Sequence, residues 1–400
     1  MALIATSLLL LTTPLLANAQ TDNGNECSCF RTNNTVNYFQ FHRFYDYRNV
    51  DSSMISNPVP DAVTTASGAA SAGVTNNYFQ SNAFTQDWSI QTWNNSGNLG
   101  GQSGSDATIL MVNSASNIYI EQSTDSSPDY NSFLTLRTSR QTNFQSAAEI
   151  DSTEQNFLHM SARFMARVIG SPGACAGLFT YLSPTDPKNP MTVQEADIEI
   201  LTNGPRNMVQ YTNQPSNAAD GRVLAQASSN VTNPNGIDWT QWLAYRVDWT
   251  PSMTQWYVNG ENVASIGFQT PRDPAGLIIN MWGDGGSWTG NMTTFDEAYL
   301  QIQYIEVVYN TSGSYGGAEA ANNGIQSRDE NGALGLLQKR KKHVAGCKVV
   351  CSVDDQVNVT GTPALIYNNT GAAGIVVPGG NSGPYLLSIA LVLSLLFGIW

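Results

Sequence analysis

The chain has 400 residues, only 12% of them charged, and a formal net charge of −13. This acidity argues against nucleic acid as a partner, because a nucleic-acid-binding surface needs basic side chains. The length allows two domains, although one all-β domain can take about 200–250 residues. Abundant Asn, Ser, Thr, Gly and aromatic residues favour a β-rich extracellular protein that handles a neutral polymer.

The first nineteen residues have the pattern of a secretory signal peptide. An apolar run, Leu3–Leu16, is followed by Ala17-Asn18-Ala19, which is an A-x-A cleavage site. The segment departs from the pattern in having no Lys or Arg at its start. We therefore expect residues 1–19 to be removed and the mature chain to be secreted.

Short stretches of alternating or apolar residues, separated by turn signals, predict strands between residues 37 and 308. Residues 60–80 predict a surface loop, and there is no amphipathic helix and no fixed-period repeat. The pattern predicts one all-β domain over residues 20–312, a β-sandwich or jelly roll. The predicted strands lie at 37–48, 87–93, 108–112, 118–121, 133–138, 161–168, 177–181, 194–200, 209–212, 242–249, 256–263, 277–282 and 300–308.

The segment Gln194–Ile200 carries three carboxylates at every second position, Glu195, Asp197 and Glu199, with apolar residues between them. A period of two is the strand period, so the acids share one face and the apolar residues the other. Three acids side by side repel each other and are poor strand formers. We therefore expect this strand to serve a reaction that needs closely spaced carboxylates.

Such carboxylates suit retaining glycoside hydrolysis, in which one acts as nucleophile and another as proton donor. The Cα atoms of Glu195 and Glu199 would lie about 13 Å apart along an ideal strand, so their side chains must lean inward across Asp197. Asp197 can hydrogen-bond one of them and, by like-charge repulsion, keep the acid protonated. The alternatives are a hydrated acidic strand face or a cation site.

Other chemistries have little support in the sequence. The chain has no G-x-S-x-G motif for a nucleophilic serine and no G-x-x-x-x-G-K-[ST] phosphate loop. Its histidines lack metal-ligand spacing, so we expect no metal site and no cofactor. They are His42, His159 and His343.

The acidic motif E-x-D-x-E resembles the signature of glycoside hydrolase family 16, whose fold is a concanavalin A-like β-jelly roll. Segments on either side resemble the same family, and the resemblance covers roughly residues 37–312. It implies that Glu195 is the nucleophile, that Glu199 is the acid/base and that Asp197 assists. The similar segments are Gly173–Tyr181, Asp248–Pro251, Trp256–Gly260, Asn280–Trp282 and Gly285–Trp288.

The motif lacks the inserted residue of laminarinase-like members, so it resembles the unbulged branches, which include lichenases and wall transglycosylases. The resemblance implies a retaining, monomeric hydrolase that acts on cell-wall β-glucan with β-1,3/1,4 linkages, or a chitin/glucan transglycosylase. Two other classes stay open. One is a lectin-like wall protein that binds carbohydrate without turnover, and the other is a structural surface protein.

Aromatic side chains are expected in the sugar cleft, because sugar rings present apolar C–H faces that stack on indole rings. Trp282 and Trp288 are the predicted substrate-binding residues, because they flank a glycine loop. A core position is the alternative for both. Trp88, Trp249 and Trp256 lie in alternating segments and are expected in the core.

The five cysteines leave at least one without an intramolecular partner. Cys175 lies in a small-residue run that leads into a strand, and we expect it to be a buried free thiol. The other four, Cys27, Cys29, Cys347 and Cys351, lie near the ends of the mature chain. Our hypothesis is that they pair among themselves and fasten the amino-terminal arm to the carboxy-terminal tail.

Residues 313–384 predict a disordered C-terminal tail, made of a low-complexity linker and a Cys-containing segment. The basic run Lys339–His343 within it favours a solvated patch, with a protease cleavage site or an anionic-surface contact as alternatives. The final residues 385–400 are apolar and uncharged but shorter than the roughly 20 residues of a spanning helix. Small residues precede them at 371–374 and 379–383, which predicts a glycosylphosphatidylinositol (GPI) signal.

We therefore expect a GPI-anchored protein of fungal cell-wall type, on the plasma membrane or in the wall, with a short tail anchor as the alternative. Asn-x-Ser/Thr sequons agree with the secretory route and predict surface positions. They begin at Asn33, Asn94, Asn230, Asn291, Asn310, Asn358 and Asn368.

Overall fold

The computed structural model describes residues 27–33, 38–126, 128–185, 189–312, 347–356, 359–368 and 375–376. The predicted signal peptide, the linker residues 313–346 with their basic run and His343, the Asn358 sequon and the apolar tail 385–400 lie outside them. Within the described ranges, no helix combines the length and apolarity that a membrane span requires.

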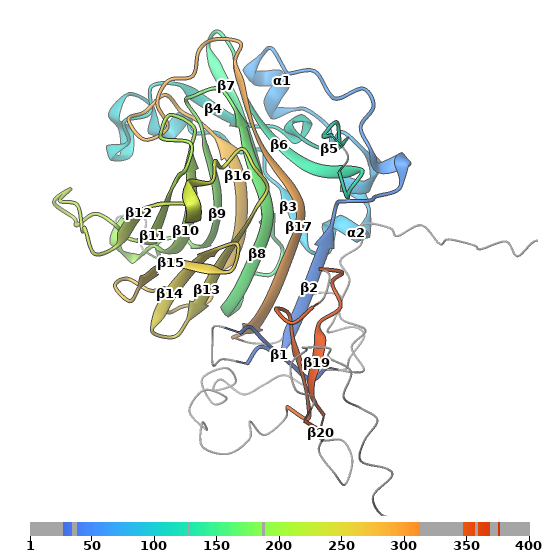
Figure 1. Cartoon of the computed structure of the whole chain (residues 1–400). Coiled ribbons are helices and arrows are strands. Elements are labelled where there is room, and N and C mark those ends of the chain that lie inside the picture. The colour runs from blue at the N-terminus through green and yellow to red at the C-terminus, as the bar shows by residue number, and fades with distance from the viewer. Residues whose placement is uncertain are drawn as a thin grey trace, which may run out of the picture.

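The described chain is a β-jelly-roll sandwich of two curved layers (Figure 1), which confirms the predicted fold class. The layers join at β6 and β7, which pair at one end. One layer contains β12 (Ser228–Thr232), β11 (Met208–Gln214), β10 (Gln194–Leu201), β9 (Cys175–Leu182), β16 (Gly276–Trp282), β7 (Phe144–Ser152) and β3 (Trp88–Ile90). The other contains β5 (Ile118–Gln122), β6 (Ser132–Arg140), β17 (Glu297–Thr311), β2 (Phe41–Asp46), β8 (Phe157–Gly170), β13 (Leu243–Thr250), β14 (Met253–Val258) and β15 (Glu261–Ile266).

Residues on the facing sides of the layers form one apolar core. Leu243, Tyr245, Val247 and Trp249 alternate along β13 and are all buried, as their period of two predicted. Trp88 and Trp256 are also buried, as expected. Asn259 and Gly260 both have positive φ and form the predicted turn between β14 and β15. The alternating segments thus fix which face of each strand enters the core.

One long strand of this fold, β7, was missed by the sequence reasoning. It pairs with β16 and lies in the layer that also contains β10. The short β4 (Leu110–Asn113) runs parallel to β7 along its first half. β7 therefore extends the acidic strand's layer, and the site below depends on it.

The predicted surface loop 60–80 contains short helices, which corrects that prediction. Thr65 caps α1 (Ala66–Ala70) by accepting from the Gly68 amide, and Asn76 caps η2 (Asn77–Gln80) in the same way. Tyr78 and Phe79 of η2 are buried in the core. The remaining helical segments are α2 (Asn82–Thr85), η1 (Ser52–Met54), η3 (Ser96–Gly104), η4 (Ala115–Asn117), η5 (Pro190–Thr192) and η6 (Pro234–Gly236).

A second, four-stranded sheet joins the amino-terminal arm to the carboxy-terminal tail (Figure 1). It contains β1 (Cys29–Arg31), β18 (Val349–Ser352), β19 (Ala364–Asn368) and β20 (Ile375–Val376). β1 and β18 run parallel although more than 300 residues separate them in sequence. The sequence had not predicted strands in this part of the tail.

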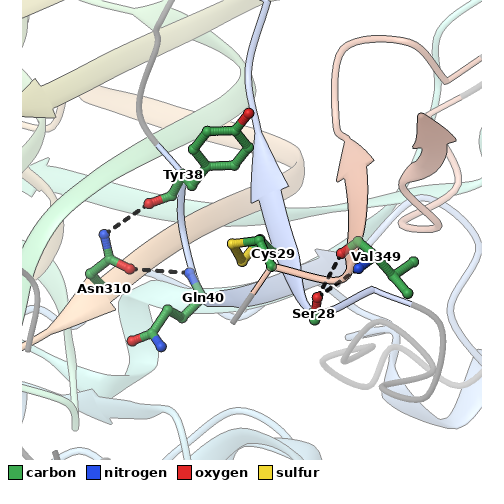
Figure 2. Close-up of a disulfide and its surroundings, with 7 residues drawn as sticks. Ser28, Cys29, Tyr38, Gln40, Asn310 and Val349 are labelled. Carbon is green, nitrogen blue, oxygen red and sulfur yellow. Dashed lines mark hydrogen bonds between the residues drawn. A yellow bond between two sulfur atoms is a disulfide. The ribbon is translucent and has the colours of Figure 1, made fainter. Parts of the chain in front are cut away.

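Two disulfides lock this small sheet, Cys27–Cys351 and Cys29–Cys347. Figure 2 shows one of them beside a second link, in which Ser28 and Val349 exchange hydrogen bonds. Cys175 is free and buried. The pairing confirms the hypothesis that the end cysteines fasten the arm to the tail.

Charged side chains hold the tail to the outer face of the sandwich. Asp354, which follows β18, forms ion pairs with Arg163 of β8 and with Arg246 of β13. Burial alone would raise the pKa of Asp354, but the charges of the two arginines outweigh it and lower that pKa. The tail is therefore an integral part of the folded domain.

One predicted glycosylation site is not at the surface. Asn310 is 3% exposed, so the expectation that every sequon marks a surface position is wrong there. Its side chain accepts a hydrogen bond from the Gln40 amide at 3.1 Å and donates to the Tyr38 carbonyl at 3.2 Å (Figure 2). Asn33, Asn94, Asn230 and Asn291 are exposed and Asn368 is half-buried.

We predict that Asp354→Asn lowers the free energy of unfolding by about 2–3 kcal/mol at pH 7, because it removes the carboxylate that Arg163 and Arg246 share and leaves them only Glu306 and Asp248, respectively. Since the folded-state pKa of Asp354 is lowered, its contribution is present above about pH 4 and is lost as the pH falls further. Urea unfolding at pH 7 and at pH 3 measures both effects.

The neighbouring Asp355 is exposed and supplies the matched control. Asp355→Asn should change the free energy of unfolding by less than about 0.5 kcal/mol. Equal unfolding midpoints for the two variants at pH 7 would contradict the role given to Asp354.

Candidate active site

The three acids of β10 lie together in a cavity of about 650 Å³. Glu195, Asp197 and Glu199 line it, while Ala196 and Ile198 on the opposite face are buried in the core. The strand is held between β9 and β11 by antiparallel pairing on both sides. The period of two therefore sets both the acidic floor of the cavity and the apolar underside of the strand.

The neighbouring strand β9 determines how much room the acids have. Tyr181, Phe179 and Gly177 lie opposite Glu195, Asp197 and Glu199, respectively. A Cβ atom at Gly177 would lie 2.6 Å from Asn280 Oδ1, which is closer than real Cβ contacts. Glycine at this position therefore keeps the cavity floor open beside Glu199.

Asp197 is the most deeply buried of the three acids, at 2% exposure. Burial raises its pKa well above the usual value, and the charges of Glu195 and Glu199 raise it further. Its side chain is hydrogen-bonded to Glu195 and accepts from Gln214 Nε2 at 3.3 Å. Asp197 therefore holds a proton and donates it in a hydrogen bond to Glu195.

The pKa values of both glutamates are raised, but the causes differ. Burial raises the pKa of Glu195 to about 7, and the hydrogen bond from Asp197 limits the rise. Burial and the charge of Glu195 raise the pKa of Glu199 to about 8, and hydrogen bonds from Trp288 and Cys175 limit it. The negative charge of Glu195 thus favours the protonated form of Glu199.

The two predicted tryptophans occupy different places in the site. Trp282 lines the cavity at the end of β16. Trp288 is half-buried, and its indole Nε1 donates a hydrogen bond to Glu199 Oε1 at 3.0 Å. Trp282 is therefore positioned to contact a molecule that enters the cavity, whereas Trp288 contacts the Glu199 carboxyl group.

A second acidic pair, Glu149 and Asp151 of β7, lines the same cavity. Trp93 Nε1 donates to Glu149 Oε1 at 2.6 Å, and Asn280 Nδ2 donates to Glu149 Oε2 at 3.1 Å. Burial and then the charge of Glu149 raise the pKa of Asp151 to about 7. The run Ala148–Asp151 has the same alternation of acid and apolar residues as Ala196–Glu199, so the signal was present in the sequence and was overlooked.

Strand register shows how the two acidic groups are related. Glu199 pairs with Gly177, Gly177 with Asn280, and Asn280 with Glu149, so the four lie in one row across four strands. Three strand spacings separate the ends of this row by roughly 14 Å. The cavity therefore runs across the strands, with one acidic pair at one end and the triplet at the other.

Among the described residues, no group of three His, Cys, Asp or Glu side chains is arranged to hold a metal ion. His42 is buried, with its Nε2 atom 3.1 Å from Glu306 Oε1, and His159 is buried as well.

Residues 112–305 match the family model described as glycosyl hydrolases family 16. This part of the chain is therefore similar to that family. The match contains the acidic triplet, both acids of β7, Trp282 and Trp288, but not Trp93. The resemblance found in the sequence motifs is thereby confirmed at the level of the family.

Curated relatives of this chain include a beta-glucanase of Bacillus subtilis strain 168, 25% identical over 135 residues, which are 33% of this chain and 51% of the relative. A Bacillus licheniformis beta-glucanase is 26% identical over 121 residues, 30% of this chain and 45% of the relative. The chain thus spans about half the length of the curated relatives it matches.

Solved structures with a related fold include a Bacillus licheniformis beta-glucanase, at a TM-score of 0.41 and 21% identity, over 56% of this chain and 94% of that one. Another is a prokaryotic beta-1,3-1,4-glucanase (lichenase) derived from a mouse hindgut metagenome, at a TM-score of 0.43 and 16% identity. That alignment covers 68% of this chain and 99% of the other.

We predict that Glu195→Gln lowers the pKa of Glu199 below its value of about 8, because the substitution removes the negative charge that raises it. Carbon-13 NMR titration of protein labelled at the glutamate carboxyl carbons measures this pKa. Glu261→Gln, at an exposed position on β15, is the control and should leave it unchanged. An unchanged Glu199 pKa in Glu195→Gln would contradict the electrostatic coupling.

Proposed function

We propose that the protein is a retaining glycoside hydrolase that cleaves β-glucan with β-1,3/1,4 linkages. The observation that carries the proposal is the acidic triplet of β10 on the floor of the cavity, in which the negative charge of Glu195 raises the pKa of Glu199. The match of residues 112–305 to the model of glycosyl hydrolases family 16 and their similarity to bacterial beta-glucanases support it.

In the first step, the Glu195 carboxylate attacks the anomeric carbon while Glu199 protonates the departing glycosidic oxygen. The carbon–oxygen bond of the leaving sugar breaks and a glycosyl ester with Glu195 forms. Asp197, which holds a proton, keeps its hydrogen bond to Glu195 and fixes the attacking carboxylate in place.

In the second step, the Glu199 carboxylate takes a proton from the acceptor, whose oxygen attacks the anomeric carbon and releases Glu195. Water as the acceptor gives hydrolysis, and a sugar hydroxyl gives transglycosylation. Two inversions at the same carbon leave the β configuration unchanged.

The charge of the cavity favours a neutral polysaccharide. Among the described residues, its lining has six carboxyl groups and no Lys, Arg or His side chain. An anionic polymer would be repelled by this lining, since like charges at close range cost free energy. Trp93, which is 46% exposed, and Trp282 supply aromatic surface for sugar rings.

We further propose that the protein acts as a monomer at the cell surface, secreted through residues 1–19 and GPI-anchored through the tail 385–400 in the manner of a fungal wall enzyme. The two disulfides support an oxidising, extracytoplasmic setting. Release of the protein from intact cells by a phosphatidylinositol-specific phospholipase tests the anchor, and retention on the cells would contradict it.

We predict that Glu199→Ala lowers kcat/KM on β-glucan by about 10²- to 10⁴-fold, the usual contribution of a general acid. With a 2,4-dinitrophenyl β-glycoside and added azide, this variant should regain turnover and form the β-glycosyl azide, because azide attacks the glycosyl-enzyme without a base. Glu195→Ala with azide should form the α-glycosyl azide instead, because azide then replaces the nucleophile.

Proton NMR of the azide products decides between the two roles. If Glu199→Ala gave the α-glycosyl azide and Glu195→Ala the β-glycosyl azide, the roles assigned to Glu195 and Glu199 would be exchanged. Tight oligosaccharide binding by the wild-type protein with no product after long incubation would contradict the enzyme and favour a lectin-like protein.

We predict that the enzyme cleaves a carboxymethylated β-glucan with a kcat/KM at least about tenfold lower than the unmodified polymer at low salt, because the substituents meet six carboxyl groups. A hydroxyethylated polymer of the same degree of substitution controls for bulk. Added salt should narrow the difference, since screening weakens repulsion. Equal rates on the carboxymethylated and hydroxyethylated polymers would show that the cavity charge has no part in selectivity.

A further inference from the structure

Two hydrogen-bond donors from different parts of the chain converge on one oxygen of Glu199. Trp288 Nε1 lies 3.0 Å from Oε1, and Cys175 Sγ lies 3.9 Å from the same atom. None of the described residues hydrogen-bonds Oε2 of Glu199. That oxygen is also not one of the side-chain polar atoms that are buried without a hydrogen-bond partner. The two oxygens of this carboxyl group therefore have different surroundings.

Both donors are held firmly in place. Cys175 is fully buried and begins β9, where it pairs with Leu201 of β10 and Trp282 of β16. The residue before it is fixed as well, because the Ala174 amide donates to the Thr202 hydroxyl at 2.9 Å. The donor thiol therefore has little freedom to leave Glu199.

Trp288 belongs to the loop after β16 and is held by two contacts of that loop. Asn203 Nδ2 donates to the Trp288 carbonyl at 3.3 Å, and the Ser287 amide donates to Asp106 Oδ2 at 2.8 Å. The indole N–H can only donate, and burial raises the pKa of the Cys175 thiol well above its usual value, so the thiol keeps its proton. Each group is thus a permanent donor toward Oε1.

We propose that Trp288 and Cys175 are positioning residues that keep Oε1 of Glu199 as an acceptor and thereby place the transferable proton on Oε2. The proposal rests on the function proposed above, in which Glu199 protonates the leaving oxygen. A proton on Oε1 would meet the hydrogens of the indole and the thiol, which is unfavourable. The proton on Oε2 is on the oxygen that no described residue covers, where a glycosidic oxygen can receive it.

The same two donors also set how readily Glu199 gives up its proton. Donors to Oε1 stabilise the carboxylate form, so they hold the pKa of Glu199 below the value that burial and Glu195 alone would impose. A lower pKa makes Glu199 a stronger acid toward the leaving group. The arrangement therefore combines proton placement with acid strength in one pair of contacts.

The test uses Trp288→Phe and Cys175→Val, which remove one donor each, and Cys175→Ser, which keeps a donor at the same position. kcat/KM is measured on β-glucan, whose leaving sugar needs a proton, and on a 2,4-dinitrophenyl β-glycoside, whose leaving group does not. We expect losses on β-glucan of about tenfold for Trp288→Phe and about threefold for Cys175→Val, with little loss on the activated substrate. Cys175→Ser should lose less activity on β-glucan than Cys175→Val does, because it keeps a donor on the same side of Glu199.

The pH profile gives a second readout with a definite sign. Loss of a donor raises the pKa of Glu199, so the basic limb of kcat/KM against pH should move to higher pH in Trp288→Phe and Cys175→Val. Cys175→Ser should leave the basic limb near its wild-type position. Thermal unfolding of each variant shows whether the fold is intact.

Carbon-13 NMR titration of Glu199 in the same variants separates this proposal from the proposed function, because it needs no turnover. A raised Glu199 pKa in both donor-removing variants supports the proposal even if β-glucan proves to be the wrong substrate. Equal losses on the two substrates, together with an unmoved Glu199 pKa, would overturn it and leave both residues a purely structural role.

Discussion

The site depends on one unfavourable feature, three carboxyl groups held side by side on one strand in surroundings that disfavour charge. Burial raises the pKa of Glu195, Asp197 and Glu199, and mutual repulsion raises the pKa of Asp197 and Glu199 further. Such a cluster keeps some of its protons near neutral pH. This retention is what acid catalysis needs, because a fully ionised triplet could accept protons but not donate one.

The rest of the fold stabilises that arrangement. Apolar residues on the underside of β10 enter the core, so the strand stays in place although its other face is acidic. Three residues from different segments of the chain donate hydrogen bonds to the acids. Gln214 donates to Asp197, and Trp288 and Cys175 donate to Glu199. On the outer layer, Asp354, which follows the tail strand β18, forms ion pairs with Arg163 and Arg246 and so fastens the disulfide-linked tail to the sandwich.

Features that depend on local sequence period were predictable, and features that depend on distant partners were not. The alternation in Gln194–Ile200 and the turn at Asn259-Gly260 appear in the structure where the sequence placed them. The same alternation at the end of Phe144–Ser152 was overlooked because its first half is irregular. The β1–β18 pairing joins residues more than 300 positions apart, and the contact of Trp288 with Glu199 joins a loop to a strand, so neither has a local signal.

Trapping of the covalent intermediate tests the central claim most directly. A 2-deoxy-2-fluoro β-glucan oligosaccharide with a good leaving group should inactivate the wild-type protein by forming a stable ester, and peptide mass spectrometry should find the sugar on Glu195. The account predicts this label and predicts none in Glu195→Gln. A label on another residue, or steady turnover of natural β-glucan without any trapped ester, would contradict the assignment of the acidic strand.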